Sequence, residues 1–424
     1  MWPAGRPWVR HGLRTPVVQH GLRVVRERVT ADGKLGGVKR PFVQTALVAS
    51  LLLVCGVLSQ LIQATYGDAA PTPPPVAPAE GSKGLRIVDG IPVARLRGSA
   101  REMGRLHGEL FKEQIAFLHR EYFDALAVKV LGRPAIDAWA KGCEPFIPEE
   151  MREEMRGLAE GAGLPYETVL ASNCVTDRLQ NVLCSTVVAT GDAARDGAVL
   201  FGRNLDFPGR NILQKMTVVI VYHREGAPPL AVITWPGLIG LLSGMNAEGV
   251  AGATMMIHAG RPLSAGLPYP LMYRLALERA KKAADVRTFL ATCRRTCPNN
   301  FMVVDGTGAA EVLEWDQQTV AVRSADRGAL CSTNYFRSPE LEQTGRPIGK
   351  GRYTSLEEFL ARERGAIDLP RVIAALREVA TPWFNNVQSM VFLPATREMH
   401  LSVGGKLPAA EQRFAFLPRT ALFE

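Results

Sequence analysis

The pattern of apolar and polar positions divides the chain into segments with different periodicities. Residues 84–98 alternate apolar and polar side chains around an Asp-Gly pair, which predicts two strands joined by a turn. From Ser99 onward the apolar positions recur at helical spacing, and Glu102 has the spacing of a capping box. A second helical pattern that ends in glycines follows. Residues 99–180 are therefore predicted to be mainly helical.

From Cys184 to about residue 260 the periodicity changes to short β-branched runs separated by Gly, Pro and Asp. Runs this closely spaced indicate an antiparallel sheet rather than βαβ units. Helices are predicted at 268–296, 354–364 and 369–380, with strands between them and a closing hairpin at 389–405. Clusters of strands that alternate with pairs of helices predict one α+β domain of stacked layers.

An apolar run at 43–63 is near the roughly 20 residues that are needed to span a bilayer. The preceding residues 1–42 contain nine Lys/Arg and two acidic residues, a local net charge of +7. This bias predicts a cytoplasmic N-terminus and a body outside the cytoplasm, in the cell envelope. A signal anchor and a cleaved signal peptide are both consistent with the pattern. The length of the run and the lack of an A-x-A site favour the anchor.

The Pro/Ala-rich residues 64–84 are predicted to be a linker that is too stiff and too poor in apolar groups to pack. The formal net charge of the whole chain is +9, so the body beyond the basic tail is close to neutral. No clustered basic face interleaved with aromatics is found in the body, and we do not expect a nucleic-acid partner. Six of the seven cysteines lie in the part predicted to be exported, where disulfides are permitted.

Cys184 stands at the head of a predicted hairpin, and Arg203 and Asp206 stand at its foot. The strand that begins at Cys184 pairs with the one that ends at Asp206 across a turn near Gly191, which brings the three side chains together. A cysteine is a strong nucleophile only as its thiolate, which a nearby arginine favours. A carboxylate can in turn hold a protonated amine. A surface hairpin with an ordinary Arg–Asp pair explains the pattern equally well.

A base for this cysteine is not evident among the histidines, because none lies near Cys184 in a recognisable motif. One candidate is the α-amino group of Cys184 itself, if the bond after Leu183 were cut. The reference pKa of an α-amino group is about 8, which suits proton transfer near neutral pH. No His lies at a ligand-like spacing from the Cys293 and Cys297 pair, so no metal site is predicted.

The segment 184–207, "CSTVVATGDAARDGAVLFGRNLDF", resembles the opening of Cys-type N-terminal nucleophile (Ntn) hydrolases. In particular it is similar to the acyl-CoA:6-aminopenicillanic acid acyltransferase family, which is related to choloylglycine hydrolases and acid ceramidase. Five further segments follow the order of the family: "GSAREMGRLHGEL", "SGMNAEGVAGATM", "CSTNYF", "GKGRYTSLEEF" and "QSMVFLPATREMHLSVG". The resemblance spans roughly residues 90–405.

The resemblance implies a four-layer αββα sandwich and a self-cleaving precursor. Cleavage between Leu183 and Cys184 would leave a small chain (85–183) and a large catalytic chain (184–420) in association. Cys184 would then attack the amide of a small N-acyl substrate with its own amine as base. The family pattern places Asn246 and Asn334 as oxyanion donors and Arg352 as a site arginine. It needs no cofactor or metal.

Some residues depart from the family pattern or are open to another interpretation. Leu183 stands where many relatives have glycine, and a bulkier residue could slow self-cleavage. An unprocessed, inactive envelope scaffold and an ester or phospholipid hydrolase on the same fold therefore remain alternatives. His107 is interpreted as a helix-packing residue, Asn173 as structural, and Asn385 and Asn386 as loop residues.

Overall fold

The computed structural model of the chain describes residues 71–77, 84–179, 183–258, 262–382 and 385–424. The predicted basic tail 1–42 and the predicted membrane segment 43–63 lie outside these residues. Among the described residues, the structure contains no helix with the length and apolar character that a membrane span requires.

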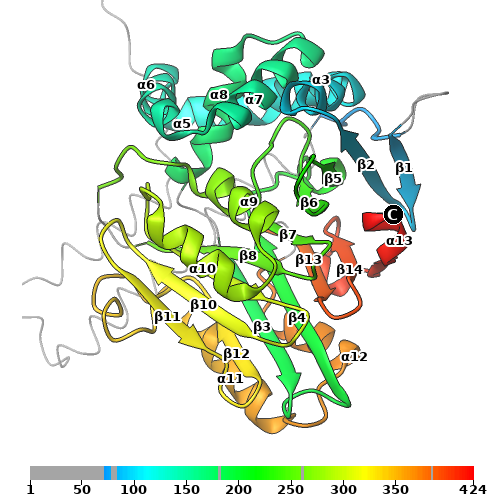
Figure 1. Cartoon of the computed structure of the whole chain (residues 1–424), viewed down its shortest axis with the longest axis vertical. Coiled ribbons are helices and arrows are strands. Elements are labelled where there is room, and N and C mark those ends of the chain that lie inside the picture. The colour runs from blue at the N-terminus through cyan, green and yellow to red at the C-terminus, as the bar shows by residue number, and fades with distance from the viewer. Residues whose placement is uncertain (1–70, 78–83, 180–182, 259–261, 383–384) are drawn as a thin grey trace, which may run out of the picture. The chain divides into compact units, whose positions relative to one another are not determined.

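Two β-sheets form the centre of the described chain (Figure 1). The larger has nine strands in the order β1-β2-β5-β6-β7-β8-β9-β10-β11, and all neighbours are antiparallel except β2 and β5. Its strands are β1 (Leu85–Val88), β2 (Ile91–Arg97), β5 (Val218–His223), β6 (Leu230–Thr234), β7 (Ser243–Asn246), β8 (Ala251–Met256), β9 (Asn299–Val304), β10 (Ala310–Trp315) and β11 (Val320–Ser324).

The smaller sheet has six antiparallel strands in the order β12-β3-β4-β13-β14-β15 within the described residues. It contains the predicted hairpin that begins at Cys184 and the predicted closing hairpin, and both are confirmed. Its strands are β3 (Leu183–Gly191), β4 (Gly197–Asp206), β12 (Ala329–Ser332), β13 (Asn386–Leu393), β14 (Glu398–Val403) and β15 (Ala415–Leu417).

Helices cover each sheet, and the two sheets face one another. Helices α9 (Tyr269–Arg279) and α10 (Ala283–Thr292) contact the larger sheet, whereas α11 (Lys350–Arg362) and α12 (Leu369–Glu378) contact the smaller one. Between the sheets β3 contacts β8, and the amide of Asn300 donates to the hydroxyl of Ser332 at 3.2 Å. The architecture is thus mixed α/β, with helices on each sheet, as the alternation of strand clusters and helix pairs predicted.

The segment before Cys184 is mainly helical, as predicted, and its helices lie together at the top of Figure 1. The capping box of Ser99 and Glu102 is present at its first helix. The elements are α3 (Ala100–Leu110), α4 (Lys112–Leu118), the π-helix η1 (His119–Val128), α5 (Lys129–Leu131), α6 (Arg133–Cys143), η2 (Glu144–Phe146), α7 (Glu149–Ala162), α8 (Tyr166–Cys174) and η3 (Val175–Arg178). Short helices later in the chain are η4 (Gln214–Met216), η5 (Ala409–Glu411) and α13 (Arg419–Phe423).

Glycines allow α3 and α7 to pack with their backbones in contact. A Cβ atom at Gly104 would lie 2.0 Å from the carbonyl oxygen of Glu154, and one at Gly157 would lie 2.0 Å from that of Arg101. No side chain larger than hydrogen fits at either position, because heavy atoms cannot approach so closely. The N-terminal helices therefore form a tightly packed unit.

The N-terminal segment is an integral part of the described fold. Strand β2 joins the larger sheet beside β5, with Val93 in register with Val219. On α7, Glu154 forms a buried bidentate ion pair with Arg274 of α9, with contacts of 2.6 and 2.7 Å. Backbone pairing and a buried ion pair thus join this segment to the residues that follow Cys184.

Part of the Pro/Ala-rich linker packs on the body, contrary to the prediction from its composition. In the described stretch 71–77, Pro73 is buried and Val76 packs against the hydrophobic core. Gln114 of α4 donates to the carbonyl oxygen of Pro75 at 2.7 Å. A proline-rich chain is already extended and loses little entropy when it docks, so few apolar contacts are enough to hold it.

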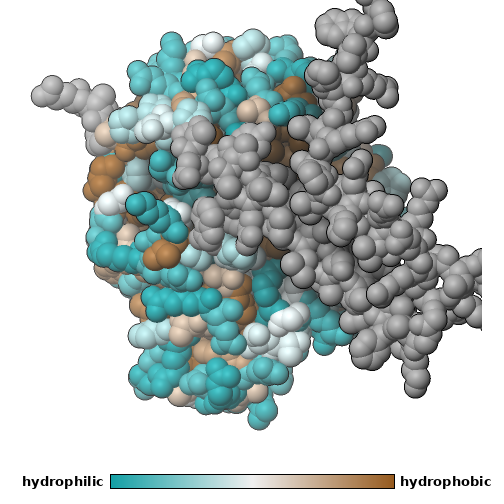
Figure 2. All heavy atoms as spheres, turned by 180° about the vertical axis from the view of Figure 1, so that it is seen from behind, coloured by the Kyte–Doolittle hydropathy of each residue, from teal (hydrophilic) through white to brown (hydrophobic). Residues whose placement is uncertain are grey.

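Exposed apolar side chains are spread over the described surface. The large ones are Ile87, Val130, Val322, Leu407 and Phe416. On the face seen in Figure 2, hydrophilic residues predominate between small apolar groups where the surface is not grey.

Candidate active site

The hairpin of β3 and β4 sets the positions of three predicted site residues. Leu183 is in register with Asp206, and Thr186 with Arg203. Side chains alternate between the two faces of a sheet, so Cys184 and Arg203 project from one face and Asp206 from the other. The predicted hairpin is confirmed, but it does not bring the three side chains together, because Asp206 projects from the opposite face to Cys184 and Arg203.

Asn334 holds the backbone N–H of Cys184. That N–H donates to Asn334 Oδ1 at 2.7 Å, and Asn334 Nδ2 donates to the carbonyl oxygen of Met256 at 2.9 Å. The surroundings fix the orientation of this amide, because a flipped amide would place its NH₂ group against two donors and its oxygen against a carbonyl. The residue that was predicted to bind an oxyanion therefore accepts a hydrogen bond from the Cys184 nitrogen in this structure.

Arg352 of α11 forms hydrogen bonds to three of the other predicted site residues. Its Nη1 donates to the Cys184 carbonyl oxygen at 3.1 Å and to Asp206 Oδ2 at 3.2 Å. Its Nη2 donates to Asn334 Oδ1 at 2.9 Å. Arg352 is 17% exposed, whereas Cys184 and Asn334 are fully buried. The arginine that the resemblance gave as a site residue thus binds three other predicted site residues, Cys184, Asp206 and Asn334.

Asp206 is a buried carboxyl with two partners. Besides Arg352, it accepts a hydrogen bond from Asn386 Nδ2 at 2.8 Å. Burial raises the pKa of Asp206 above its usual value, while the Arg352 guanidinium and the hydrogen bond from Asn386 oppose the rise. The Cys184 nitrogen binds Asn334, so the predicted contact between this carboxylate and the cysteine amine is replaced by an indirect link through Arg352.

Arg203 is fully buried and faces the larger sheet. Its Nε donates to Ser243 Oγ, its Nη1 to the carbonyl oxygen of Asn204 at 2.7 Å, and its Nη2 to that of Leu242 at 3.5 Å. All three acceptors are neutral, and Arg203 has no ion pair within the part of the chain that the structure describes. The guanidinium therefore places a positive charge without a direct ion pair on the face from which Cys184 projects, and the Asp206 carboxyl interacts with it only at longer range.

Asn246 does not belong to this cluster, and its predicted place at the oxyanion is not supported. Its Nδ2 donates to the carbonyl oxygens of Leu277 and Ala280, at 2.8 and 2.7 Å. Its Oδ1 accepts from the backbone N–H groups of Glu248 and Val250. These bonds fix the turn between β7 and β8 against the end of α9. The Gly-x-Asn-x-x-Gly segment is thus a structural turn here.

Two site features were missed at the sequence level. Asn386 was assigned to a loop, but it opens β13 and binds Asp206. Gly349 precedes α11 with φ +84°, and a Cβ atom there would lie 2.8 Å from Arg352 Nη2. The motif "GKGRY" contains this glycine, and its fixed spacing to Arg352 was the available signal.

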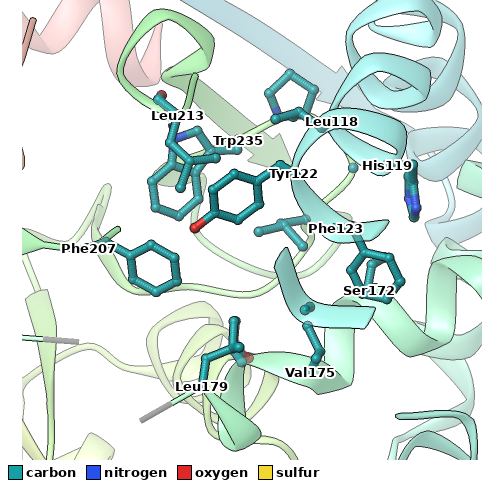
Figure 3. Close-up of a pocket in the computed structure, with 15 residues that line it drawn as sticks. Leu118, His119, Tyr122, Phe123, Ser172, Val175, Leu179, Phe207, Leu213 and Trp235 are labelled. Carbon is teal, nitrogen blue, oxygen red and sulfur yellow. Dashed lines mark hydrogen bonds between the residues drawn. The ribbon is translucent and has the colours of Figure 1, made fainter. Parts of the chain in front are cut away.

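An apolar cavity of about 70 Å³ lies between the N-terminal helices and the core. Tyr122 projects from the π-helix between Phe207 and Trp235, as Figure 3 shows, and its hydroxyl donates to the carbonyl oxygen of Pro208 at 2.8 Å. Phe207 directly follows Asp206, and Leu179 on another wall precedes Cys184 by a few residues. The cavity is thus lined by residues that neighbour two of the site residues in the chain, whereas none of the predicted site residues lines it.

A second, smaller cavity of about 10 Å³ adjoins the first, because Thr176 and Leu238 line both. It is also lined by Leu242, whose carbonyl oxygen accepts from Arg203. The smaller cavity is thus lined by one residue that binds Arg203. Among the described residues, no group of three or more His, Cys, Asp or Glu side chains is arranged to hold a metal ion.

A family model for acyl-coenzyme A:6-aminopenicillanic acid acyl-transferase matches residues 193–407, which is slightly more than half of the chain. The chain belongs to this family. The matched residues include Arg203, Asp206, Asn334 and Arg352, whereas Cys184 precedes them. The recognition made from the sequence motifs is thus confirmed.

Relatives of this acyl-transferase family member include proteins named as amide hydrolases. An uncharacterized protein of Archaeoglobus fulgidus is 27% identical over 270 residues, covering 54% of this chain and 44% of that protein. The N-acylethanolamine-hydrolyzing acid amidase of Cavia porcellus is 29% identical over 103 residues, covering 24% and 28%. The chain thus spans less than half the length of these curated relatives.

Among solved structures, the Caenorhabditis elegans N-acylethanolamine-hydrolyzing acid amidase ortholog is similar to this chain. The match has a TM-score of 0.40 at 18% identity and covers 55% of this chain and 100% of the amidase chain. The family thus includes acyltransferases by name, and relatives with amide-hydrolase names lie beside it.

Proposed function

We propose that the chain is a self-processing amidohydrolase or acyltransferase with the αββα fold of the Ntn hydrolases and Cys184 as its nucleophile. The proposal rests on two hydrogen bonds at Cys184: its backbone N–H donates to Asn334, and its backbone C=O accepts from Arg352. Strand β12 pairs with β3 only as far as Thr186, so the buried backbone groups of Cys184 need other partners, and two polar side chains supply them. These contacts hold the residue that must become the new N-terminus.

The first step is cleavage of the chain before Cys184. The Cys184 sulfur attacks the carbonyl carbon of Leu183, and the peptide nitrogen leaves with a proton as the free amine. Water then hydrolyses the resulting thioester, which gives the carboxylate of Leu183 and restores the thiol. Asn334 Oδ1 already accepts the N–H of the bond that breaks, so it can retain the amine after cleavage.

In turnover, the free amine of Cys184 takes the thiol proton, and the sulfur attacks the amide carbon of the substrate. The amine returns the proton to the leaving nitrogen, and a thioester to the enzyme remains. Water or an acceptor amine then takes the acyl group. We assign Asn334 to orienting the Cys184 amine and Arg352 to holding Asn334 and Asp206 in place.

The apolar cavity, which is lined by Phe207 next to Asp206 in the chain, suits the acyl group of the substrate. Its aromatic and aliphatic walls would bury a hydrocarbon chain, and each buried methylene contributes about 0.8 kcal/mol. The named activity of the Cavia porcellus relative, hydrolysis of N-acylethanolamines, supports a small N-acyl substrate for this chain. The predicted membrane segment 43–63 and the position of the body outside the cytoplasm complete the proposal.

N-terminal sequencing of the purified protein tests the proposal. We expect two fragments on a denaturing gel, a large fragment that begins at Cys184, and one intact chain for Cys184→Ala. A large fragment with any other first residue would overturn the mechanism. One intact wild-type chain, with acyl transfer that is unchanged in Cys184→Ala, would favour the alternative of an unprocessed scaffold protein.

A further inference from the structure

One wall of the apolar cavity is a short loop between β6 and β7. Trp235, Gly237 and Leu238 line the cavity, and Gly237 has φ +89°, a conformation that favours glycine. The loop belongs to the part of the chain that follows Cys184. Its backbone groups are buried, so each needs a hydrogen-bond partner.

Side chains of the N-terminal segment supply those partners. The N–H of Gly237 donates to His107 Nε2 at 3.0 Å. Asn173 Nδ2 donates to the carbonyl oxygen of Gly237 at 3.1 Å, and the N–H of Ile239 donates to Asn173 Oδ1 at 2.9 Å. His107 lies on α3 and Asn173 on α8. Two helices that precede the proposed cleavage site therefore hold the cavity wall.

A histidine at position 107 is less favourable for packing than an apolar side chain, because one of its ring nitrogens is buried without a hydrogen-bond partner among the described residues. His107 is fully buried, and burial lowers its pKa to about 3, so the ring is neutral. Because Nε2 accepts a hydrogen bond, the proton lies on Nδ1, which has no partner among the described residues. A buried N–H without a partner costs about 1–3 kcal/mol, and an apolar side chain would avoid this. The histidine does, however, provide Nε2 as a hydrogen-bond acceptor for the N–H of Gly237.

We propose that His107 and Asn173 are positioning residues that fix the loop 235–239, so that the N-terminal segment determines which acyl groups the cavity accepts. This inference rests on the proposed function, in which the cavity holds the acyl group. The cavity of about 70 Å³ is roughly half of the ~150 Å³ cavity that takes up benzene. A small displacement of one wall therefore changes the accepted size by a large fraction.

The test compares acyl-length profiles. Amides of one amine with acyl chains of increasing length are hydrolysed by wild type, Asn173→Ala, His107→Leu and His107→Gln. We expect the first two variants to change the long-to-short ratio of kcat/KM by about tenfold, which equals about 1.4 kcal/mol. His107→Gln keeps an acceptor for Gly237 and should restore most of the wild-type ratio.

Asp305→Ala is the matched control. Asp305 also makes three hydrogen bonds, to the N–H groups of Ala283 and Thr307 and to the Thr307 hydroxyl, but it fixes a different loop. We expect this variant to lose stability and keep the wild-type ratio. An unchanged ratio in Asn173→Ala and His107→Leu, or an equal change in Asp305→Ala, would overturn the inference.

A binding measurement separates this inference from the proposed function. If wild type hydrolyses none of the amides, the proposed function fails, and the affinity of a dansyl-labelled fatty amide is measured instead. We expect Asn173→Ala and His107→Leu to change its Kd at least about fivefold relative to Asp305→Ala. Equal affinities in all variants would show that the two side chains do not position the cavity wall.

Discussion

Two fully buried arginines lie in opposite electrostatic surroundings. Arg274, between α9 and the N-terminal helices, binds Glu154 through two contacts and Glu278 through a third at 2.9 Å. Its guanidinium also lies 3.6 Å from the centre of the Tyr222 ring. Arg203, beside Cys184, binds only neutral oxygens in the described chain. Arg274 is paired directly with two carboxylates, whereas Arg203 has no direct ion pair in the described chain and interacts with Asp206 only at longer range.

This difference separates a structural charge from a functional one. A buried charge without a counter-charge is costly, so a fold that needs only packing would neutralise it or replace it. At Arg274 two carboxylates do so. At Arg203 the charge remains on the face from which Cys184 projects, where a thiolate and a substrate carbonyl would carry negative charge. We infer that the arginine without an ion pair serves the chemistry.

The largest expected effect is on stability, in Arg274→Met. This substitution leaves Glu154 buried without a direct ion pair and leaves Glu278 with Arg224 alone, and it should cost about 3–5 kcal/mol of unfolding free energy. Urea unfolding in a Cys184→Ala background measures it, because that chain stays in one piece. The double variant with Glu154→Met should recover part of the loss. A loss below about 1 kcal/mol would contradict the structural role that we assign to Arg274.

A buried carboxyl without an arginine should make stability depend on pH. Asp177 of η3 is buried, it has no ion pair among the described residues, and burial raises its pKa to about 7 against the opposing influence of Thr296. The thiols and phenols packed around it, Cys143, Cys174, Cys297, Tyr269 and Tyr273, are neutral in this pH range.

Between about pH 4 and 7 the folded chain keeps the Asp177 proton, whereas the unfolded chain releases it. Stability is therefore complete below about pH 4, falls by up to about 1.4 kcal/mol per pH unit, and levels off above 7. Urea unfolding against pH should show this slope in Cys184→Ala, and the added Asp177→Asn should remove it. The same slope in both would mean that another group titrates.

A third prediction concerns chemistry at Arg203. We expect Arg203→Met to slow self-cleavage and acyl transfer by about 100-fold, or about 2.7 kcal/mol. The unfolding free energy should change by less than about 2 kcal/mol, because only hydrogen bonds to neutral groups are lost. Quenched-flow gels and urea unfolding measure the two effects. A variant that is strongly destabilised but fully active would reverse the roles assigned to the two arginines.

The sequence predicted most of the scaffold because its signals are local. Turn residues and β-branched alternation gave the hairpin from Cys184 to Asp206, and the Ser99 capping box gave the first helix of the N-terminal segment. The family resemblance supplied Asn334 and Arg352, which are far from Cys184 in the chain. Both lie beside it in the structure.

The errors arose where tertiary packing decides the role of a side chain. Asn246 has the expected motif, but the carbonyl oxygens of α9 occupy its amide. Asn386 stands next to a register shift in β13, and such an irregularity re-aims a side chain in a way that periodicity does not reveal. Pro73 is buried although its segment has the composition of a free linker.

The smallest expected effect concerns a third arginine, Arg352, whose position depends on the neighbouring Gly349. A Cβ atom at Gly349 would lie 2.8 Å from Arg352 Nη2. The backbone φ of Gly349 is +84°, a conformation that an alanine rarely adopts. Gly349→Ala should therefore push the guanidinium from Asn334 and slow self-cleavage by about tenfold, or about 1.4 kcal/mol. At Gly351, two residues further on and inside α11, a Cβ atom meets nothing within 4 Å.

Gly351→Ala is thus the control, and it should leave the rate unchanged while it slightly stabilises α11. A double-mutant cycle with Arg352→Ala shows whether Gly349 acts through the arginine. If it does, Gly349→Ala adds nothing once Arg352 is gone. Additive losses would mean that Gly349 acts on the backbone of α11 alone. The network around Cys184 would then depend less on the fit of Arg352 than its three hydrogen bonds suggest.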